Sequence, residues 1–368
     1  MPKLHVAQLS EVMPYMPEIE HLNLLRLKSA SCGQVFMCGL GFEGRCLNGP
    51  TALATTGIKS VRAIYFEYGT NRDDNTSNRS QLLEQLGEIS GSVESLEVED
   101  HGFPNRLRQS LKSAAAASKA HELRVLFDIS VVSNRLLMRT MKVLMELDID
   151  LTLLYSEAAL YHPTLAEYQS DPTKWESGGP LALDFGVNQV EYGEEHPGYQ
   201  VDQLPDCVIS ICGFSKDRTR AAISKVDPSL LTVPGDKVVC LVGVPHLPEN
   251  HWRLAMMRKI HELGAEVPQY EVSTFDYKKT LCTLEEIYEA RAGRFKFTLS
   301  PLGSKMQALG SALFCYLKPD IRVVFATPKQ YNATLYSEGC RETWSIEFGS
   351  IRKIRELLDT VGLLRIEE

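Results

Sequence analysis

The chain has 368 residues, of which 44% are hydrophobic and 23% are charged, and its formal net charge is −8. This composition is typical of a globular protein with a large core and enough length for two domains. The acidic balance argues against a sequence-independent DNA coat, which needs a basic stripe, so no bulk nucleic-acid binding is expected.

The spacing of the cysteines and the first residues of the chain indicate the cellular compartment. Nine cysteines occur without a CxxC pair, a pattern typical of reduced core residues and not of a zinc site, so no metal is expected. The first residues, MPKLHVAQLSEVMP, lack the basic start and apolar centre of a signal peptide. We therefore expect a cytoplasmic protein that does not contact a membrane.

The chain begins with an N-terminal extension, residues 1–33, whose role the sequence does not indicate. Residues 34–156 then alternate strand-like apolar runs, such as VFMC and RVLFDIS, with helical patterns such as NRSQLLEQLGEIS. Strands that alternate with helices predict right-handed βαβ units around a parallel sheet. We interpret residues 34–156 as a first Rossmann-like domain.

The alternation fails in residues 157–205, which are rich in Gly and Pro and contain a candidate hairpin in ALDFGVNQVEYG. This insertion or linker is too long for a simple connection, and we interpret it as a lid or packing arm. Residues 206–340 repeat the series of strands and helices and predict a second Rossmann-like domain. Residues 341–368 predict a C-terminal strand followed by an amphipathic helix.

The two predicted domains share a pattern of strand, polar turn and helix. RVLFDISVVSNRLLM in the first corresponds to KFTLSPLGSKMQALG in the second, and the offset from Arg135 to Lys305 equals that from Tyr161 to Tyr331. The turns after the first strands, around Gly41 and Gly213, are separated by nearly the same offset. Several blocks at nearly one spacing predict an internal duplication. The predicted fold class is therefore α/β, with two tandem Rossmann-like units that contain parallel sheets and are related by duplication.

These turns are the predicted ligand site. In a sheet of strand order 3-2-1-4-5, a ligand binds beyond the carboxyl ends of strands one and four. Glycines there allow close approach of the backbone, and helix N-termini with Arg or Lys suit phosphate or carboxylate. The predicted ligand-binding residues are Gly41, Phe42, Arg45, Ser130, Ser133, Asn134, Arg135, Tyr161, Gly213, Phe214, Arg218, Ser300, Gly303, Ser304, Lys305 and Tyr331.

Each of these residues also has a structural interpretation. Gly41 and Gly213 can serve tight turns only, and Ser130 and Ser300 can serve as helix caps only. The arginines sit where ion pairs on helix surfaces are common, and the tyrosines can be core residues.

An enzyme is the first alternative, either NAD-dependent or cleaving its bound nucleotide, with Asp128, Glu157 and His162 as acid–base candidates. The segment Gly39–Gly44 is a literal GxGxxG motif, and Glu67 lies where a ribose-binding acid belongs. NAD binding is disfavoured because the residues Asn48-Gly49-Pro50 would interrupt the helix that receives the pyrophosphate. No Walker motif, nucleophile elbow or HExxH occurs.

The stretch SPLGSKMQALGSALF, with its partner DISVVSNRLLM, resembles the strand-four turn of CARF domains, which are Rossmann-like sensors of cyclic oligonucleotides. Two such units in one chain are similar to the SAVED architecture of bacterial antiphage signalling. The resemblance implies that the turns Gly41–Arg45, Ser130–Arg135, Gly213–Arg218 and Ser300–Lys305 hold the ligand.

The resemblance also implies a nucleotide-binding sensor or regulatory subunit in bacterial antiphage defence. Its anionic, nucleotide-like ligand, such as a cyclic oligonucleotide, would lie in a cleft between the duplicated halves, and no cofactor is certain. Because no effector is recognisable in the sequence, a partner chain would carry out the response to ligand binding. The second alternative is a ligand-free scaffold subunit of a defence complex, in which residues 157–205 grip a partner.

Overall fold

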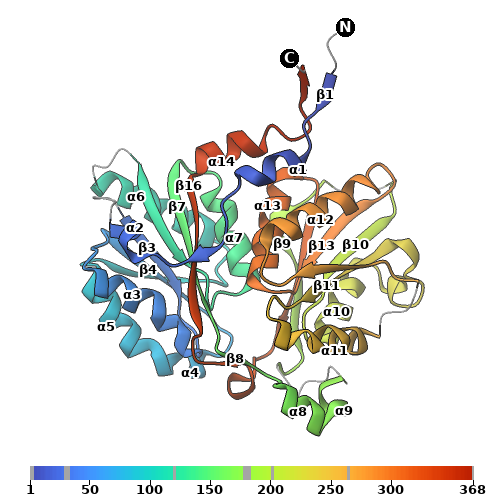
Figure 1. Ribbon diagram of the computed structural model, residues 1–368, viewed down its shortest axis with the longest axis horizontal. Helices are drawn as coiled ribbons and strands as arrows, with labels where there is room; N and C mark the ends of the chain where they lie inside the picture. Colours follow the sequence, from blue (N-terminus) through green and yellow to red (C-terminus); the bar gives the residue numbers. More distant parts are fainter. Residues whose placement is uncertain are drawn as a thin grey trace. The chain divides into compact units, whose positions relative to one another are not determined.

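The structure is a computed structural model (Figure 1). It describes residues 4–28, 34–118, 122–176, 184–199, 203–262 and 266–366. The chain forms two compact units: the first comprises Met1–Leu160 and Ser337–Glu368, and the second comprises Tyr161–Tyr336.

The first unit contains a seven-stranded sheet in the order β2-β16-β7-β6-β3-β4-β5. Its parallel strands are β3 (Gln34–Gly39), β4 (Arg62–Glu67), β5 (Val93–Glu97), β6 (Leu123–Asp128) and β7 (Ile149–Glu157). The antiparallel strands at one side are β16 (Glu342–Ser350) and β2 (Glu20–His21). The parallel part confirms the expected order 3-2-1-4-5.

Helices cover both faces of this sheet. Helices α3 (Asn48–Thr56) and α5 (Arg79–Ile89) pack on the face that contains Phe36 and Cys38. Helix α6 (Phe103–Ser118) packs on the other face, where the Phe103 ring meets that of Phe66. A sheet covered on both faces needs strands that are apolar throughout, and this explains the continuous runs in β3 and β6.

The other elements of the first unit are β1 (Leu4–Val6), α1 (Leu9–Val12), η1 (Met13–Tyr15), α2 (Leu24–Lys28), η2 (Gly44–Leu47), α4 (Arg72–Asn75), η3 (Thr76–Asn78), α7 (Asn134–Leu144), α14 (Ile351–Leu358) and β17 (Leu364–Ile366).

The second unit contains a six-stranded sheet in the order β12-β11-β10-β13-β14-β9. Its parallel strands are β10 (Asp206–Ile211), β11 (Val238–Val244), β12 (Gln269–Ser273), β13 (Lys296–Pro301) and β14 (Arg322–Pro328). The antiparallel strand β9 (Val187–Pro197) lies beside β14. Both units therefore share the parallel order 3-2-1-4-5, followed by an antiparallel strand.

The helices of the second unit are α8 (Leu165–Ser170), α9 (Pro172–Glu176), α10 (Lys216–Val226), η4 (Pro228–Leu231), η5 (Gly235–Lys237), η6 (Pro248–Asn250), α11 (Trp252–His261), α12 (Tyr277–Glu289), α13 (Lys305–Leu317) and η7 (Ala333–Leu335). The short strands β8 (Leu160–Tyr161) and β15 (Ser337–Glu338) pair where the chain passes from one unit to the other and back.

The antiparallel strands that lie beside the fifth parallel strand of each sheet are exchanged along the chain. Strand β9 follows β7 in sequence but pairs with β14, whereas β16 follows β14 in sequence but pairs with β7. Figure 1 shows β16, in red, beside β7, in green. The predicted C-terminal strand and helix are thus β16 and α14, and they belong to the first unit. This differs from the predicted boundaries because β16 pairs with a strand that precedes the whole second unit in the chain.

The segment predicted as an insertion, residues 157–205, lies mostly in the second unit. Of the candidate hairpin ALDFGVNQVEYG, residues 182 and 183 lie outside the described residues. The rest forms a single bridge at Asp184 and then the first part of β9. Among the described residues, no helix is long and apolar enough to cross a membrane.

Candidate functional site

The turn after β6 leads into the capped N-terminus of α7. The Ser133 hydroxyl accepts a hydrogen bond from the Leu136 N–H at 3.1 Å, and the Ser133 N–H donates to the Tyr68 hydroxyl at 2.9 Å. Asn134 and Arg135, both half-buried, begin the helix. A cation therefore stands in the first turn, at the positive end of the helix dipole.

The corresponding turn after β13 has the same form in the second unit. Ser304 and Gln307 form a reciprocal capping box: the Ser304 hydroxyl accepts from the Gln307 N–H at 3.2 Å, and Gln307 Oε1 accepts from the Ser304 N–H at 2.9 Å. The Ser304 hydroxyl also donates to the Thr274 carbonyl at 2.6 Å. Half-buried Lys305 is the first residue of α13.

Replacing Ser304 with alanine is expected to lower the free energy of unfolding of the second unit by about 1 kcal/mol, because an orphan helix N–H loses its acceptor. Urea unfolding followed by amide hydrogen exchange in α13 measures this loss. Ser304→Thr, which keeps the hydroxyl, is the matched control. A loss as large in the threonine variant would contradict a capping role.

Glycines let the turns after strands one and four approach each other closely. A Cβ atom on Gly213 would lie 2.4 Å from the Leu302 carbonyl oxygen, and one on Gly41 would lie 3.2 Å from Val131. A Cβ on Gly303 would lie 2.2 Å from Gln307 Oε1. Real Cβ atoms do not come so near to backbone oxygen, so Gly213 is needed for packing whether or not a ligand binds.

Arg45 lies inside the first unit and is only 5% exposed. Its Nε and Nη2 atoms donate to the Glu43 carboxylate at 3.0 and 3.1 Å, and its Nη1 donates to the Ser156 carbonyl at 3.0 Å. The Glu43 carboxylate also accepts from the Ser337 hydroxyl. Arg45 thus ties the turn after β3 to the end of β7.

Arg218 makes the equivalent contact in the second unit. Its Nε donates to the Ala326 carbonyl at 2.8 Å, near the end of β14, and its Nη1 lies 3.7 Å from Asp184 Oδ2. Ala326 follows Ser156 at the same offset that relates Lys305 to Arg135. Both predicted arginines therefore hold the fifth strand of their own sheet and pair with an internal carboxylate.

The acid–base candidate Asp128 is 2% exposed. Its Oδ1 accepts from the Ser130 N–H at 2.9 Å and from the Ser130 hydroxyl, whereas Oδ2 has no well-formed hydrogen bond within the described ranges. That oxygen lies beside Gly49 at the start of α3, where a Cβ would come within 2.2 Å. Burial raises the pKa of Asp128 to about 6, against the lowering effects of Ser130 and Arg45.

The other two acid–base candidates are also buried. Glu157 Oε2 accepts a hydrogen bond from Trp344 Nε1 at 3.3 Å. The His162 Nδ1 atom contacts the Glu167 carboxylate at 2.9 Å. Asp128 and Glu157 belong to the first unit, whereas His162 belongs to the second.

The remaining predicted site residues differ in burial and in the groups that they contact. Phe42 is half-buried, and Ser300 is fully buried with a hydroxyl that lacks a partner in the described part of the chain. Phe214 packs against the core cluster of the second unit. The ring of Tyr331 lies 5.8 Å from the Arg218 guanidinium.

The sequence analysis missed Arg253, in the first turn of α11, which is 6% exposed. Its Nη2 atom donates to the carbonyls of Tyr161 and Pro163 at 2.7 and 2.6 Å. Burial lowers the pKa of Arg253 to about 10. It also missed Asp184, because no local pattern predicts that this acid meets Arg218.

The GxGxxG segment does not lead directly into an α-helix. Gly44 begins the short helix η2, and α3 starts only at Asn48. Glu67, the candidate ribose-binding acid, forms an ion pair with Arg79. Neither arrangement supports a dinucleotide site.

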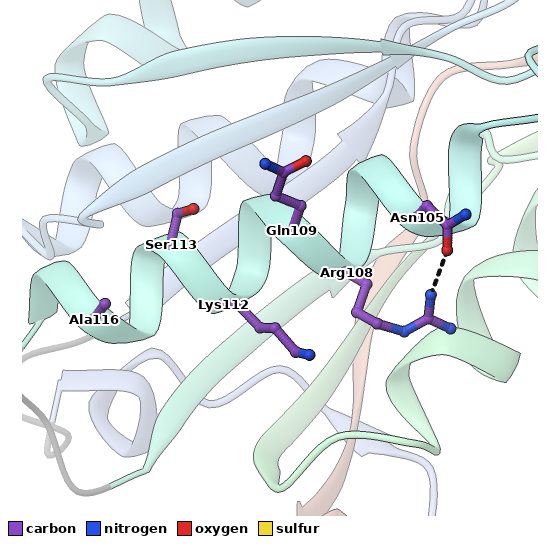
Figure 2. A pocket seen from close by; sticks show the side chains of 6 residues that line it. All are labelled: Asn105, Arg108, Gln109, Lys112, Ser113 and Ala116. Atoms are coloured by element: carbon purple, nitrogen blue, oxygen red, sulfur yellow. Dashed lines mark hydrogen bonds between the residues drawn. The ribbon is translucent and has the colours of Figure 1, made fainter.

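An open depression runs along the outer face of α6, lined by Asn105, Arg108, Gln109, Lys112, Ser113 and Ala116. Figure 2 shows that these side chains come from this one helix and that Arg108 donates to Asn105, at 2.8 Å. Arg108 also pairs with Glu146 at 2.6 Å. None of the predicted site residues lines this depression.

In the described part of the chain, no group of three or more His, Cys, Asp or Glu side chains could hold a metal ion. No family model matches the chain, and no curated protein matches its sequence.

Proposed function

We propose that this chain is a sensor or regulatory subunit that binds an anionic, nucleotide-like ligand at the carboxyl-end turns of its parallel sheets. The observation that carries the proposal is the repeated turn after the fourth strand. In both units a serine caps the following helix and a cation stands in its first turn. That turn lies next to the first strand, the place where open α/β sheets bind ligands.

The resemblance of these turns to CARF and SAVED sensors makes a cyclic oligonucleotide the leading candidate ligand. It also suggests bacterial antiphage defence as the setting and a separate effector chain as the output. The enzyme alternatives gain no support, since all three acid–base candidates are buried and Glu67 pairs with Arg79.

An internal duplication remains part of this proposal. It is supported by the shared strand order 3-2-1-4-5 and by the constant offset between equivalent positions of the two halves. It is also supported by the arginines after the first strands, which donate to equivalent carbonyls at Ser156 and Ala326.

The test begins with mass spectrometry of small molecules released from the natively purified protein, followed by thermal-shift titration with cyclic and linear nucleotides and NAD. Saturation at a hundredfold over Kd adds about 2.7 kcal/mol of stability. We expect Lys305→Ala and Arg135→Ala each to weaken nucleotide binding by about 10-fold or more, because a charge-assisted hydrogen bond contributes about 1.5–3 kcal/mol.

Lys237→Ala, which removes an exposed lysine from the second unit, is the matched control for the change in net charge. Unchanged affinity in both site variants would overturn the proposal. Co-purification of a stoichiometric protein, with no nucleotide and no NAD bound, would point to the scaffold alternative.

A further inference from the structure

Residues 184–186, which we call the strap, cross the second unit just before β9. Asp184 forms an isolated antiparallel bridge with Tyr331. The Phe185 N–H donates to the Gln330 carbonyl at 2.9 Å, and the Lys329 N–H donates to the Gly186 carbonyl at 2.9 Å. The strap is therefore held by a few backbone hydrogen bonds beyond the end of β14.

The Asp184 carboxylate lies at the turn between β10 and α10 and is 7% exposed. Its Oδ1 accepts from the Ser215 hydroxyl at 3.3 Å, and its Oδ2 lies 3.7 Å from Arg218 Nη1. Ser215 is the N-cap of α10, so the carboxylate stands near the positive end of this helix. The turn that the sequence predicted to bind an anion thus already holds one from its own chain.

The fit of this carboxylate is loose. Charge-assisted hydrogen bonds to carboxylate normally measure about 2.7–2.9 Å, and the contacts of Asp184 with Ser215 and Arg218 exceed this range. Burial, with a smaller effect of the Asp217 charge, raises the pKa of Asp184 above its usual value, although Arg218, Ser215 and the Gly186 N–H act in the opposite direction. The surroundings therefore compensate its negative charge incompletely.

Arg218 is also held by contacts other than the carboxylate. Its Nε is bound to the Ala326 carbonyl at 2.8 Å, and its guanidinium lies 5.8 Å from the Tyr331 ring. A fixed guanidinium, a hydroxyl donor and a helix N-terminus together form the donor set that binds phosphate oxygens. A tetrahedral oxyanion has more acceptor oxygens than a carboxylate and can satisfy these donors together.

We propose that Asp184 is a built-in occupant of an anion site formed by Ser215, Arg218 and the N-terminus of α10. A phosphate group of the ligand takes its place, and the strap is released. The inference rests on the proposed function for the identity of the ligand. It adds a regulated subsite in the second unit, in which ligand binding must displace a part of the chain itself.

Inorganic phosphate is the probe, titrated into the full chain at constant ionic strength and followed by calorimetry. Asp184→Asn keeps an acceptor for Ser215 but removes the competing charge, so phosphate should bind at least about 10-fold more tightly than to the unaltered chain. Arg218→Gln should lose phosphate binding. Asp236→Asn is the matched control, since it removes an exposed negative charge from η5 in the second unit, and its affinity should stay within about twofold of the unaltered chain.

Hydrogen exchange at the amides of Phe185 and Lys329 reports on the strap. Phosphate should speed exchange at both in the unaltered chain, and Asp184→Asn should show fast exchange without phosphate. Arg218→Gln should show no response to phosphate. Equal phosphate affinity in Asp184→Asn and Asp236→Asn would overturn the inference, as would phosphate binding that leaves both amides protected.

Different results would overturn the proposed function and the strap inference. Tighter phosphate binding by Asp184→Asn, in a chain that binds no nucleotide, would overturn the proposed function and leave the strap inference standing. Nucleotide binding that is weakened in Lys305→Ala but unaltered in Asp184→Asn and Arg218→Gln would overturn the strap inference alone.

Discussion

Replacing Arg45 with alanine is expected to lower the free energy of unfolding of the first unit by about 3–5 kcal/mol. Arg45 and Glu43 form a buried ion pair with two hydrogen bonds. Removing the guanidinium leaves the Glu43 carboxylate buried beside the Ser337 hydroxyl without its countercharge, and it takes this donor away from the Ser156 carbonyl. An uncompensated buried charge is among the most costly single changes in a protein.

The measurement is urea-dependent amide hydrogen exchange in β3 and β7, because the chain has two compact units and a single transition midpoint does not assign a loss of stability to one of them. Arg108→Ala is the control. It breaks an ion pair with Glu146 whose two side chains are 29% and 41% exposed, and it should cost less than about 1 kcal/mol. Similar losses in the two variants would show that the Arg45 network contributes no more than a surface pair.

Asp128 is expected to make the stability of the first unit depend on pH. Burial raises its pKa from 3.8 to about 6 in the folded chain, so the folded state binds its proton more tightly than the unfolded state does. The stabilisation is complete below about pH 4 and is lost as pH rises through about 6. The free energy of unfolding should therefore fall by about 3 kcal/mol over this interval.

The comparison that isolates this effect is the unaltered chain against Asp128→Asn, measured by urea unfolding at steps between pH 4 and pH 7.5. Asparagine cannot ionise, so the difference between the two stability curves should change over this interval and then level off. A constant difference would show that the carboxyl pKa is not raised in the folded state.

Much of the fold follows from local patterns. The apolar runs VFMC and RVLFDIS predict buried strands, and the rule for βαβ connections predicts a parallel sheet around them. The pairing of β16 with β7 could not be predicted in this way, because a strand in an antiparallel pair has no crossover helix that fixes its neighbour. The same holds for β9, which pairs with β14 although the four other parallel strands of that sheet lie between them in the chain.

In the candidate site, too, local sequence patterns do not reveal contacts between residues that are far apart in the chain. The sequence indicated Ser130 and Ser300 as possible helix caps, but the caps are Ser133 and Ser304. The Ser130 hydroxyl instead donates to Asp128 and accepts from the Ser156 N–H, and Ser300 lies buried inside β13. Arg45 and Arg218 were predicted as ligand-binding from residue type and position. Their acceptors at Ser156 and Ala326 lie 111 and 108 residues away, so no local pattern reveals that these guanidinium groups already hold protein backbone.

The insertion of the second unit between β7 and β16 has a consequence for synthesis on the ribosome. Residues 161–336 form a continuous unit, so they can fold as soon as they emerge. Strand β7 emerges before them, but the strand that covers its outer edge, β16, is made only afterwards. During that interval β7 presents unpaired backbone groups to other nascent chains, and an exposed strand edge of this kind promotes aggregation. The yield of correctly folded protein should therefore depend on how quickly translation proceeds from Glu157 to Ser350.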